Sequence, residues 1–146
     1  MASKICNIVN INLASIVIEI MMWITYTAFF GYMVCAETIY RSVPSLLIFS
    51  LLTLMVMAIA ILELYGTAKK HIGTMIAANV IRWIKGFIIN FLMWTIIKLF
   101  TSGLLYRIQL AFGIVFNFWD ICKIILLAKI IQSMRKEDDS RITNSV

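Results

Sequence analysis

Four long apolar stretches separated by short polar segments set the pattern of the chain. Each holds about the 20 largely apolar residues that a helix needs to cross the hydrocarbon core of a bilayer. Their spacing predicts an all-α fold, a polytopic bundle of four transmembrane helices with short loops, which forms a single membrane domain over residues 1–146. The four spans are expected at residues 8–36, 44–66, 78–101 and 108–131, followed by a cytoplasmic tail at 132–146.

The third stretch is longer than a bilayer requires. Read as one helix over residues 73–101, it measures about 44 Å at 1.5 Å per residue, against a hydrocarbon core of about 30 Å. We therefore expect its first turns to protrude into the cytoplasm. Arg82 and Lys85 then lie at the membrane interface beside Trp83, where long basic side chains extend toward water and aromatic rings are enriched.

The composition agrees with a membrane protein. Of the 146 residues, 62% are hydrophobic and 14% are charged, whereas soluble domains have about 45–50% apolar and about 25% charged residues. A water-soluble core of this size cannot hide such long apolar runs, so the lipid bilayer is the expected solvent. The one proline, Pro44, opens the second stretch, where a first helical position needs no amide hydrogen.

The distribution of basic residues predicts the orientation in the membrane. With four spans, the N-terminus, the second loop and the tail share one side, and most Lys and Arg residues fall on it. The positive-inside rule therefore places both termini in the cytoplasm. The membrane is expected to be the plasma membrane or an endosomal or lysosomal membrane. A cytoplasmic basic patch is expected, formed by Lys69, Lys70, Arg82 and Lys85. The opposite side holds Arg41, Lys98 and Arg107.

The residues that usually carry enzyme or metal chemistry do not gather into a motif. The three cysteines are an odd number without a Cys-x-x-Cys pair, which argues against a disulfide framework or a zinc site. His71 is the only histidine, and a metal site needs further ligands. The net charge of +6 is scattered among membrane-length segments rather than gathered in a basic domain, so no nucleic-acid partner is expected. We expect no catalytic residue, no cofactor and no metal.

Polar residues within the apolar spans are the most informative feature. In the first span, Glu19 belongs to a polar stripe that covers about 60° of the helix surface. In the last span, Asn117, Asp120 and Lys123 belong to a stripe of about 120°. Both stripes can turn away from lipid and toward each other. The sequence therefore predicts a buried polar network of Glu19, Asp120, Lys123 and Asn117.

Two roles for this network compete. Ionisable residues inside a membrane often mark a path for ions or protons. Alternatively, Glu19, Asp120 and Lys123 pair with one another and hold the first span against the last, so that no carboxylate lies alone in lipid. The sequence shows no repeating acidic ring, no pore signature and no discontinuous helix, which favours the structural role.

Two segments carry a resemblance to a known family. The junction at residues 61–70, Ile-Leu-Glu-Leu-Tyr-Gly-Thr-Ala-Lys-Lys, and the passage of the last span into the charged tail at residues 116–138 resemble small four-span proteins of the lysosome-associated transmembrane (LAPTM-like) type and their insect relatives. The resemblance implies a non-enzymatic endomembrane or junctional protein that acts through partners. The chain departs from the pattern in its cysteine cluster, reduced to Cys6, and in the additional charges Arg82, Lys85 and Lys123.

These observations favour a non-enzymatic membrane organiser or accessory subunit. Its expected partners are the lipid bilayer and other membrane proteins, with further copies of the chain as an option. The alternative is a small oligomeric ion channel or transporter that uses the face with Glu19, Asp120 and Lys123.

The topology can be checked with epitope tags at Met1 and Val146. Because the number of spans is even and the bases lie on one side, both tags should become protease-accessible only when the cytoplasmic face is opened. Tags that report opposite sides of the membrane would show an odd number of spans and contradict the four-span arrangement.

Overall fold

The computed structural model describes residues 2–36, 42–99 and 103–145. These residues form four helices, so the predicted all-α bundle is confirmed. All four helices are long and apolar enough to cross a membrane. They are α1 (Ala2–Ala36), α2 (Val43–Lys69), α3 (Ile72–Leu99) and α4 (Leu104–Ser145). Arg41, which was expected on the non-cytoplasmic side, lies outside the described residues.

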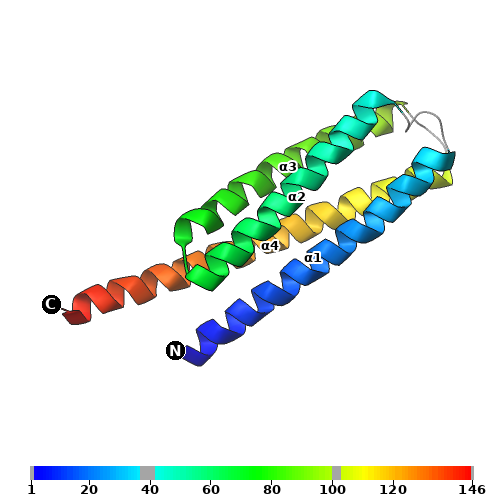
Figure 1. Cartoon of the computed structure of the whole chain (residues 1–146). Helices are drawn as coiled ribbons and strands as arrows, with labels where there is room; N and C mark the ends of the chain where they lie inside the picture. The colour runs from blue at the N-terminus through cyan, green and yellow to red at the C-terminus, as the bar shows by residue number, and fades with distance from the viewer. Residues whose placement is uncertain (1, 37–41, 100–102, 146) are drawn as a thin grey trace.

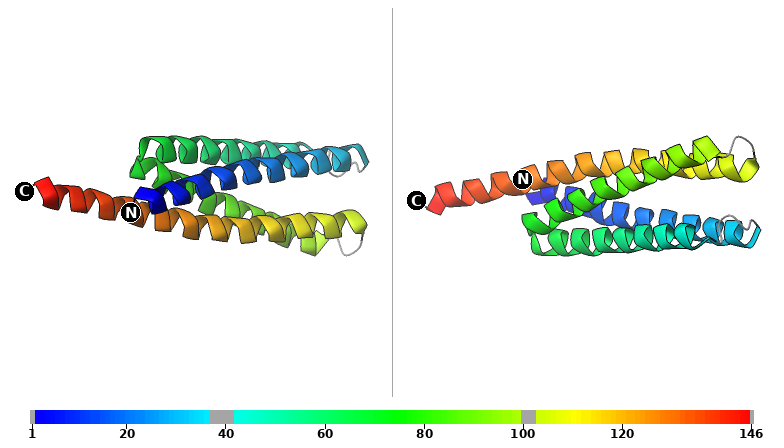
Figure 2. Two further views of the ribbon diagram at one scale, coloured as in Figure 1. Left: turned by 90° about the horizontal axis from the view of Figure 1, so that it is seen from below. Right: turned by 90° about the horizontal axis from the view of Figure 1, so that it is seen from above.

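The helices run antiparallel to their neighbours along the chain, and both termini lie at the same end of the bundle (Figure 1). Each helix packs against two others in the cyclic order α1, α2, α3, α4. The residues of the predicted tail continue α4 as one helix to Ser145, which extends beyond the other three helices at the end of the bundle with the termini (Figure 2).

The connection between α2 and α3 is very short. Lys70 ends α2 with a left-handed backbone (φ 52°), and the amide of His71 donates a hydrogen bond to the carbonyl of Gly66 at 3.0 Å. This bond uses one of the carbonyls that the end of a helix leaves without an intrahelical partner. The two helices therefore diverge from a tight junction, which brings Gly66 close to the first turn of α3.

The buried positions of α3 and α4 repeat with a spacing of three and four residues. In α3 they are Met75, Ala78, Arg82, Lys85 and Ile89, and in α4 they are Gly113, Phe116, Asp120, Lys123, Leu127, Ile130 and Met134. This spacing is typical of helices that cross at small angles and interlock their side chains, as in coiled coils and four-helix bundles. Charged residues therefore occupy core positions of the repeat.

The interior has three layers along the bundle axis. At the end away from the termini, Trp23, Leu52, Val56, Ile89 and Phe116 form an apolar cluster with several aromatic rings in contact. At the end with the termini, Met75, Leu127, Ile130 and Met134 form a second cluster. In α3 and α4 the buried charged residues come between these two clusters in the sequence, and they form the middle layer.

The close approach at Gly66 gives a direct test of the packing. A methyl group at this position would lie 2.7 Å from Thr74 Oγ1 and 2.8 Å from Met75 Cγ, so Gly66→Ala should destabilise the bundle by about 1–3 kcal/mol through overpacking. Gly31 offers a matched control, because a methyl group there meets nothing within 4 Å. Thermal unfolding of both variants in detergent should show a lower midpoint for Gly66→Ala only. Equal midpoints would mean that α2 and α3 can separate at no cost.

Candidate functional site

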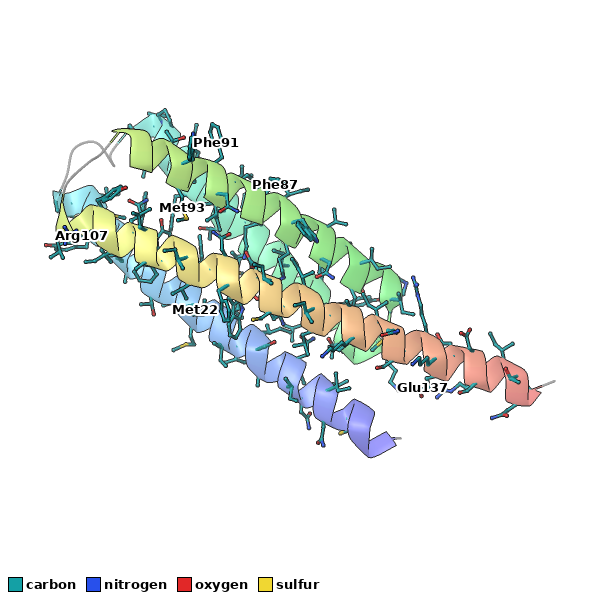
Figure 3. All side chains as sticks on the ribbon, turned by 180° about the vertical axis from the view of Figure 1, so that it is seen from behind. Met22, Phe87, Phe91, Met93, Arg107 and Glu137 are labelled. Carbon is teal, nitrogen blue, oxygen red and sulfur yellow. The ribbon has the colours of Figure 1, made fainter. Side chains whose placement is uncertain are left out.

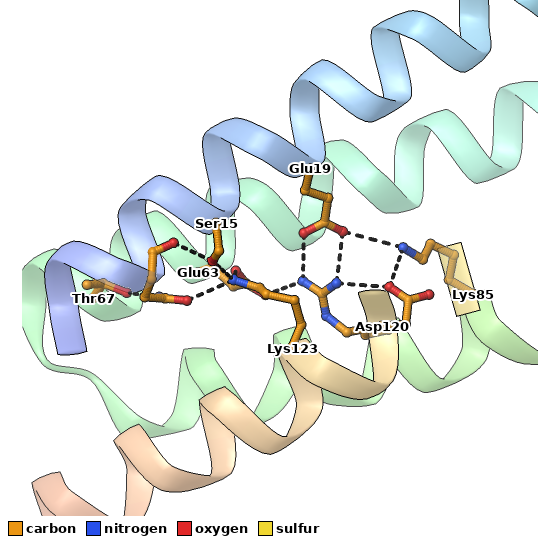
Figure 4. Close-up of polar contacts among 9 residues, drawn as sticks. Ser15, Glu19, Glu63, Thr67, Lys85, Asp120 and Lys123 are labelled. Carbon is orange, nitrogen blue, oxygen red and sulfur yellow. Dashed lines mark hydrogen bonds and ion pairs between the residues drawn. The ribbon is translucent and has the colours of Figure 1, made fainter. Parts of the chain in front are cut away.

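Six ionisable side chains meet in the middle of the bundle, and all four helices contribute to them (Figure 4). None is more than 6% exposed. Within the described residues, three of the six are acidic and three are basic, so the group is balanced in formal charge. They are Glu19 of α1, Glu63 of α2, Arg82 and Lys85 of α3, and Asp120 and Lys123 of α4.

Arg82 lies at the centre of this network and is fully buried. Its two terminal nitrogens bind both oxygens of Glu19, at 2.8 and 3.0 Å. Nη1 also donates to Asp120 Oδ1 at 3.0 Å, and Nη2 donates to Glu63 Oε1. A guanidinium group suits this position because its planar array of donors can bind several carboxylates at once. One side chain of α3 therefore connects the other three helices.

Lys85 lies on the side of Arg82 that faces the aromatic cluster. Its ammonium group binds Asp120 Oδ1 at 2.9 Å and approaches Glu19 Oε1 at 3.4 Å. Arg82 and Lys85 thus share the same oxygen of Asp120 and the same oxygen of Glu19. Two cations held this close together are compatible only because both carboxylates lie between them.

Lys123 lies on the opposite side of Arg82, toward the termini. Its ammonium group pairs with Glu63 Oε2 at 2.9 Å and donates hydrogen bonds to Asn12 Oδ1 at 2.8 Å and Ser15 Oγ at 2.5 Å. The amide of Asn12 in turn donates to Thr67 Oγ1 at 2.9 Å. The network therefore extends without a break from Thr67 of α2 to Lys85 of α3.

The cost of placing charges in a membrane explains why the network is so fully paired. A single Asp, Lys or Arg at the centre of a membrane helix costs about 2.5–3.5 kcal/mol on insertion scales. Each of the six groups contacts at least one group of opposite charge. Removing one member of a buried pair leaves its partner charged and buried. This loss destabilises a protein more than replacing both members by apolar residues.

The structure brings together most, but not all, of the predicted polar residues. Glu19, Asp120 and Lys123 belong to one network. Asn117 does not, because its side chain forms a reciprocal amide pair with Asn90 of α3, at 2.9 and 3.2 Å. The expected pairing of Lys123 with Glu19 or Asp120 is also wrong. Lys123 lies nearer the termini than Asp120 by almost one helical turn, which puts its ammonium group at the level of Glu63.

The predicted cytoplasmic basic patch requires a larger correction. Lys69 and Lys70 are exposed at the junction of α2 and α3. Arg82 and Lys85, however, are 0% and 1% exposed and belong to the buried network. Their placement at a membrane interface beside Trp83 is therefore wrong, because the carboxylates of three neighbouring helices bind them in the interior.

The sequence contained a signal for this arrangement. Arg82 and Lys85 continue the three-and-four spacing that begins at Met75 and Ala78. Glu63, which the predicted network leaves out, has the same relation to Val56 and Ile59. Charged residues in phase with the apolar core positions of a helix indicate burial, whatever their distance from the end of the span.

The arrangement resembles a metal-ion site in which a basic side chain takes the place of the metal ion. Three carboxylates converge on one point, and the guanidinium of Arg82 occupies it. Within residues 2–36, 42–99 and 103–145, no group of three His, Cys, Asp or Glu side chains could hold a metal ion.

The chain was compared with protein families, curated protein sequences and solved structures. No protein-family model, curated protein sequence or solved structure matches the chain. The resemblance to the lysosome-associated transmembrane type therefore stays a prediction.

The pairing within the network can be tested by a double-mutant comparison. Lys123→Met should lower the yield of folded protein several-fold, because Glu63 loses its lysine partner and the loss of one member of a buried pair costs about 3–5 kcal/mol. Adding Glu63→Gln should restore part of the yield. Adding Asp120→Asn removes the same amount of negative charge from a carboxylate that Lys123 does not contact, and serves as the matched control. Monodispersity in size-exclusion chromatography measures the folded fraction. Equal recovery in both double variants would show that only net charge matters.

Proposed function

We propose that this chain is a non-enzymatic four-span membrane protein, a membrane organiser or accessory subunit that binds other membrane proteins through the outward faces of its helices. The observation that supports this proposal is the closed, charge-balanced network in the bundle interior. Its ionisable groups form ion pairs with one another, and these pairs hold the four helices together.

The space left inside the bundle agrees with this role. A pocket that touches all four helices, beside Trp23, Leu52, Ile89 and Phe116, has a volume of about 40 Å³. This is room for a few water molecules at most. A bundle whose buried charges pair with one another presents a fixed outer surface, which is what a protein that organises neighbours in a membrane requires.

The short connection between α2 and α3 directs recognition to the helices. Only Lys70 and His71 separate these two helices, so no folded domain can be inserted there. Large apolar side chains cover the outer faces, such as Leu47, Leu54 and Ile61, which follow one line along α2 and are each more than half exposed. In a membrane such faces meet either lipid or the helices of other proteins.

The proposal includes an orientation in the membrane. Both termini lie at one end of the bundle, together with the exposed Lys69 and Lys70 (Figure 1). The positive-inside rule assigns this end to the cytoplasm. The plasma membrane and the endosomal or lysosomal membranes are the proposed locations.

One feature supports the alternative of a small oligomeric channel or transporter. The six ionisable groups contact one another in an unbroken series from Lys123 to Lys85 (Figure 4). Proton relays in pumps and transporters are built from such series of acidic and basic groups. In this alternative the face with Glu19, Asp120 and Lys123 would carry the ion.

Two measurements on the same purified protein separate the two proposals. For an organiser, affinity purification in mild detergent should recover defined membrane proteins. Tryptophan substitutions at outward positions such as Leu47, Leu54 and Ile61 should abolish recovery along one continuous helix face and leave the folded yield unchanged. Recovery that is insensitive to substitution on every face would contradict this proposal.

For a channel or transporter, liposomes that contain the chain should conduct ions or protons above the level of empty liposomes. The double variant Lys85→Met with Asp120→Asn keeps the charge balance of the network and should abolish that flux. For an organiser we expect no flux with the native chain. Flux that the double variant removes would establish the alternative.

A further inference from the structure

A groove runs between α3 and α4 on the outside of the bundle. Its volume is about 400 Å³, and its apolar lining consists of Trp83, Gly86 and Phe87 of α3 with Ile121 and Ile124 of α4. Figure 3 shows the two helices side by side, with Phe87 labelled on α3. A Cβ atom added at Gly86 would meet nothing within 4 Å. The missing side chain of Gly86 therefore leaves an open space on the lipid-facing side of the two helices.

Exposed aromatic side chains lie along the same helix. Trp83, Phe87, Phe91 and Trp94 of α3 are all more than half exposed, and Phe87 reaches 71%. Aromatic side chains bury large areas and dominate the energetics of interfaces. Because Gly86 and Phe87 are adjacent in the sequence, the projecting ring and the open space differ by only about 1.5 Å along the helix axis.

The amide pair of Asn90 and Asn117 also lines the groove, and Asn90 is exposed. Exposed hydroxyl groups of the spans, such as those of Thr25 and Ser50, donate to the carbonyl four residues earlier in their own helix. A carboxamide oxygen has two lone pairs, and within the described residues each oxygen of the pair accepts one hydrogen bond. Hydrocarbon offers such groups nothing further, whereas the amides of another helix do.

The membrane restricts which surfaces can pair with themselves. Two copies of one chain are inserted with the same orientation, so a symmetric pair has its two-fold axis along the membrane normal, and each residue meets the other copy at its own depth. A surface fits itself in this way only where its projections and its hollows lie at equal depth. Phe87 and Gly86 meet this condition. The same symmetry brings Asn90 to the depth of the other copy's amide pair, a match that an unrelated helix would have to supply independently.

We propose that the face formed by α3 and α4 is the interface of a homodimer, in which Phe87 of each copy enters the groove at Gly86 of the other. The two amide pairs meet about one helical turn farther along α3 and exchange hydrogen bonds across the interface. The inference goes beyond the proposed function, because it concerns contact between copies of this chain and depends neither on a foreign protein nor on ion flux.

A photoreactive aromatic residue at the interface tests the contact directly. Phe87→benzoylphenylalanine keeps a ring at this position, and ultraviolet light should convert the full chain in liposomes to a covalent dimer. With a mixture of isotopically light and heavy chains, mass spectrometry should locate the link at residues 83–90 or 117–124 of the other copy. Leu54→benzoylphenylalanine is the matched control, because Leu54 is 68% exposed and, like Phe87, lies 15 residues from the end of its helix at the α2–α3 junction. It should give no covalent dimer.

A steric block provides a second pair of variants. Gly86→Leu fills the groove from a position with open surroundings, and Gly31→Leu adds the same bulk at an equally open position on α1. Energy transfer between donor-labelled and acceptor-labelled chains in liposomes, at a series of protein-to-lipid ratios, measures self-association. Gly86→Leu should weaken the association constant about tenfold or more, because overpacking of a fitted contact costs at least this much. Gly31→Leu should leave it unchanged, and both variants should stay monodisperse in detergent.

The native chain offers a measurement that does not depend on any variant, because its own energy transfer should rise with the protein-to-lipid ratio and saturate at the level of a dimer. A native chain that stays monomeric would overturn the proposal. So would links from position 87 to lipid alone, equal dimer formation from position 54, or undiminished association of Gly86→Leu.

Discussion

The guanidinium of Arg82 is the point on which the bundle depends, because α1, α2 and α4 each contribute a carboxylate to it. In water, apolar helix faces are driven together by the loss of contact with solvent. In lipid that driving force is absent, because the acyl chains are as apolar as the side chains that they replace. Buried charges are unfavourable in lipid when they are separated. Their pairing therefore specifies how the helices are arranged. Apolar faces alone would let the helices exchange neighbours, whereas the observed arrangement gives each of the six charges a partner of opposite charge.

The same constraint orders the rest of the structure along the bundle axis. The aromatic cluster around Trp23 and Phe116 and the methionine and leucine cluster around Met75 and Leu127 close the network at both ends. They exclude competing polar groups, and the low dielectric that they create strengthens the pairing within the network. The apolar packing and the charges therefore support each other, and neither alone explains why the four helices adopt this order.

The number of spans and the fold class could be predicted because lipid imposes a simple requirement of length and apolarity on each helix. The inward orientation of Glu19, Asp120 and Lys123 could also be predicted, from stripes on single helices. The partners could not, since they depend on how four helices rotate and slide relative to one another. Arg82 and Lys85 were misplaced because bases near the end of a long span are usually interfacial. Their phase with Met75 and Ala78 was the better guide, and it outweighed their position along the span.

The distribution of the six charges between the two halves of the chain has a consequence for biosynthesis. The first two helices contribute only Glu19 and Glu63, whereas the last two contribute Arg82, Lys85 and Lys123 with the single acid Asp120. The first hairpin is therefore synthesised with two carboxylates whose counter-charges do not yet exist. These carboxylates are costly in lipid until the second hairpin supplies their partners. A chain that stops after α2 leaves the carboxylates of Glu19 and Glu63 in the membrane without basic partners. Incomplete molecules therefore differ chemically from complete ones, and a cell can recognise this difference.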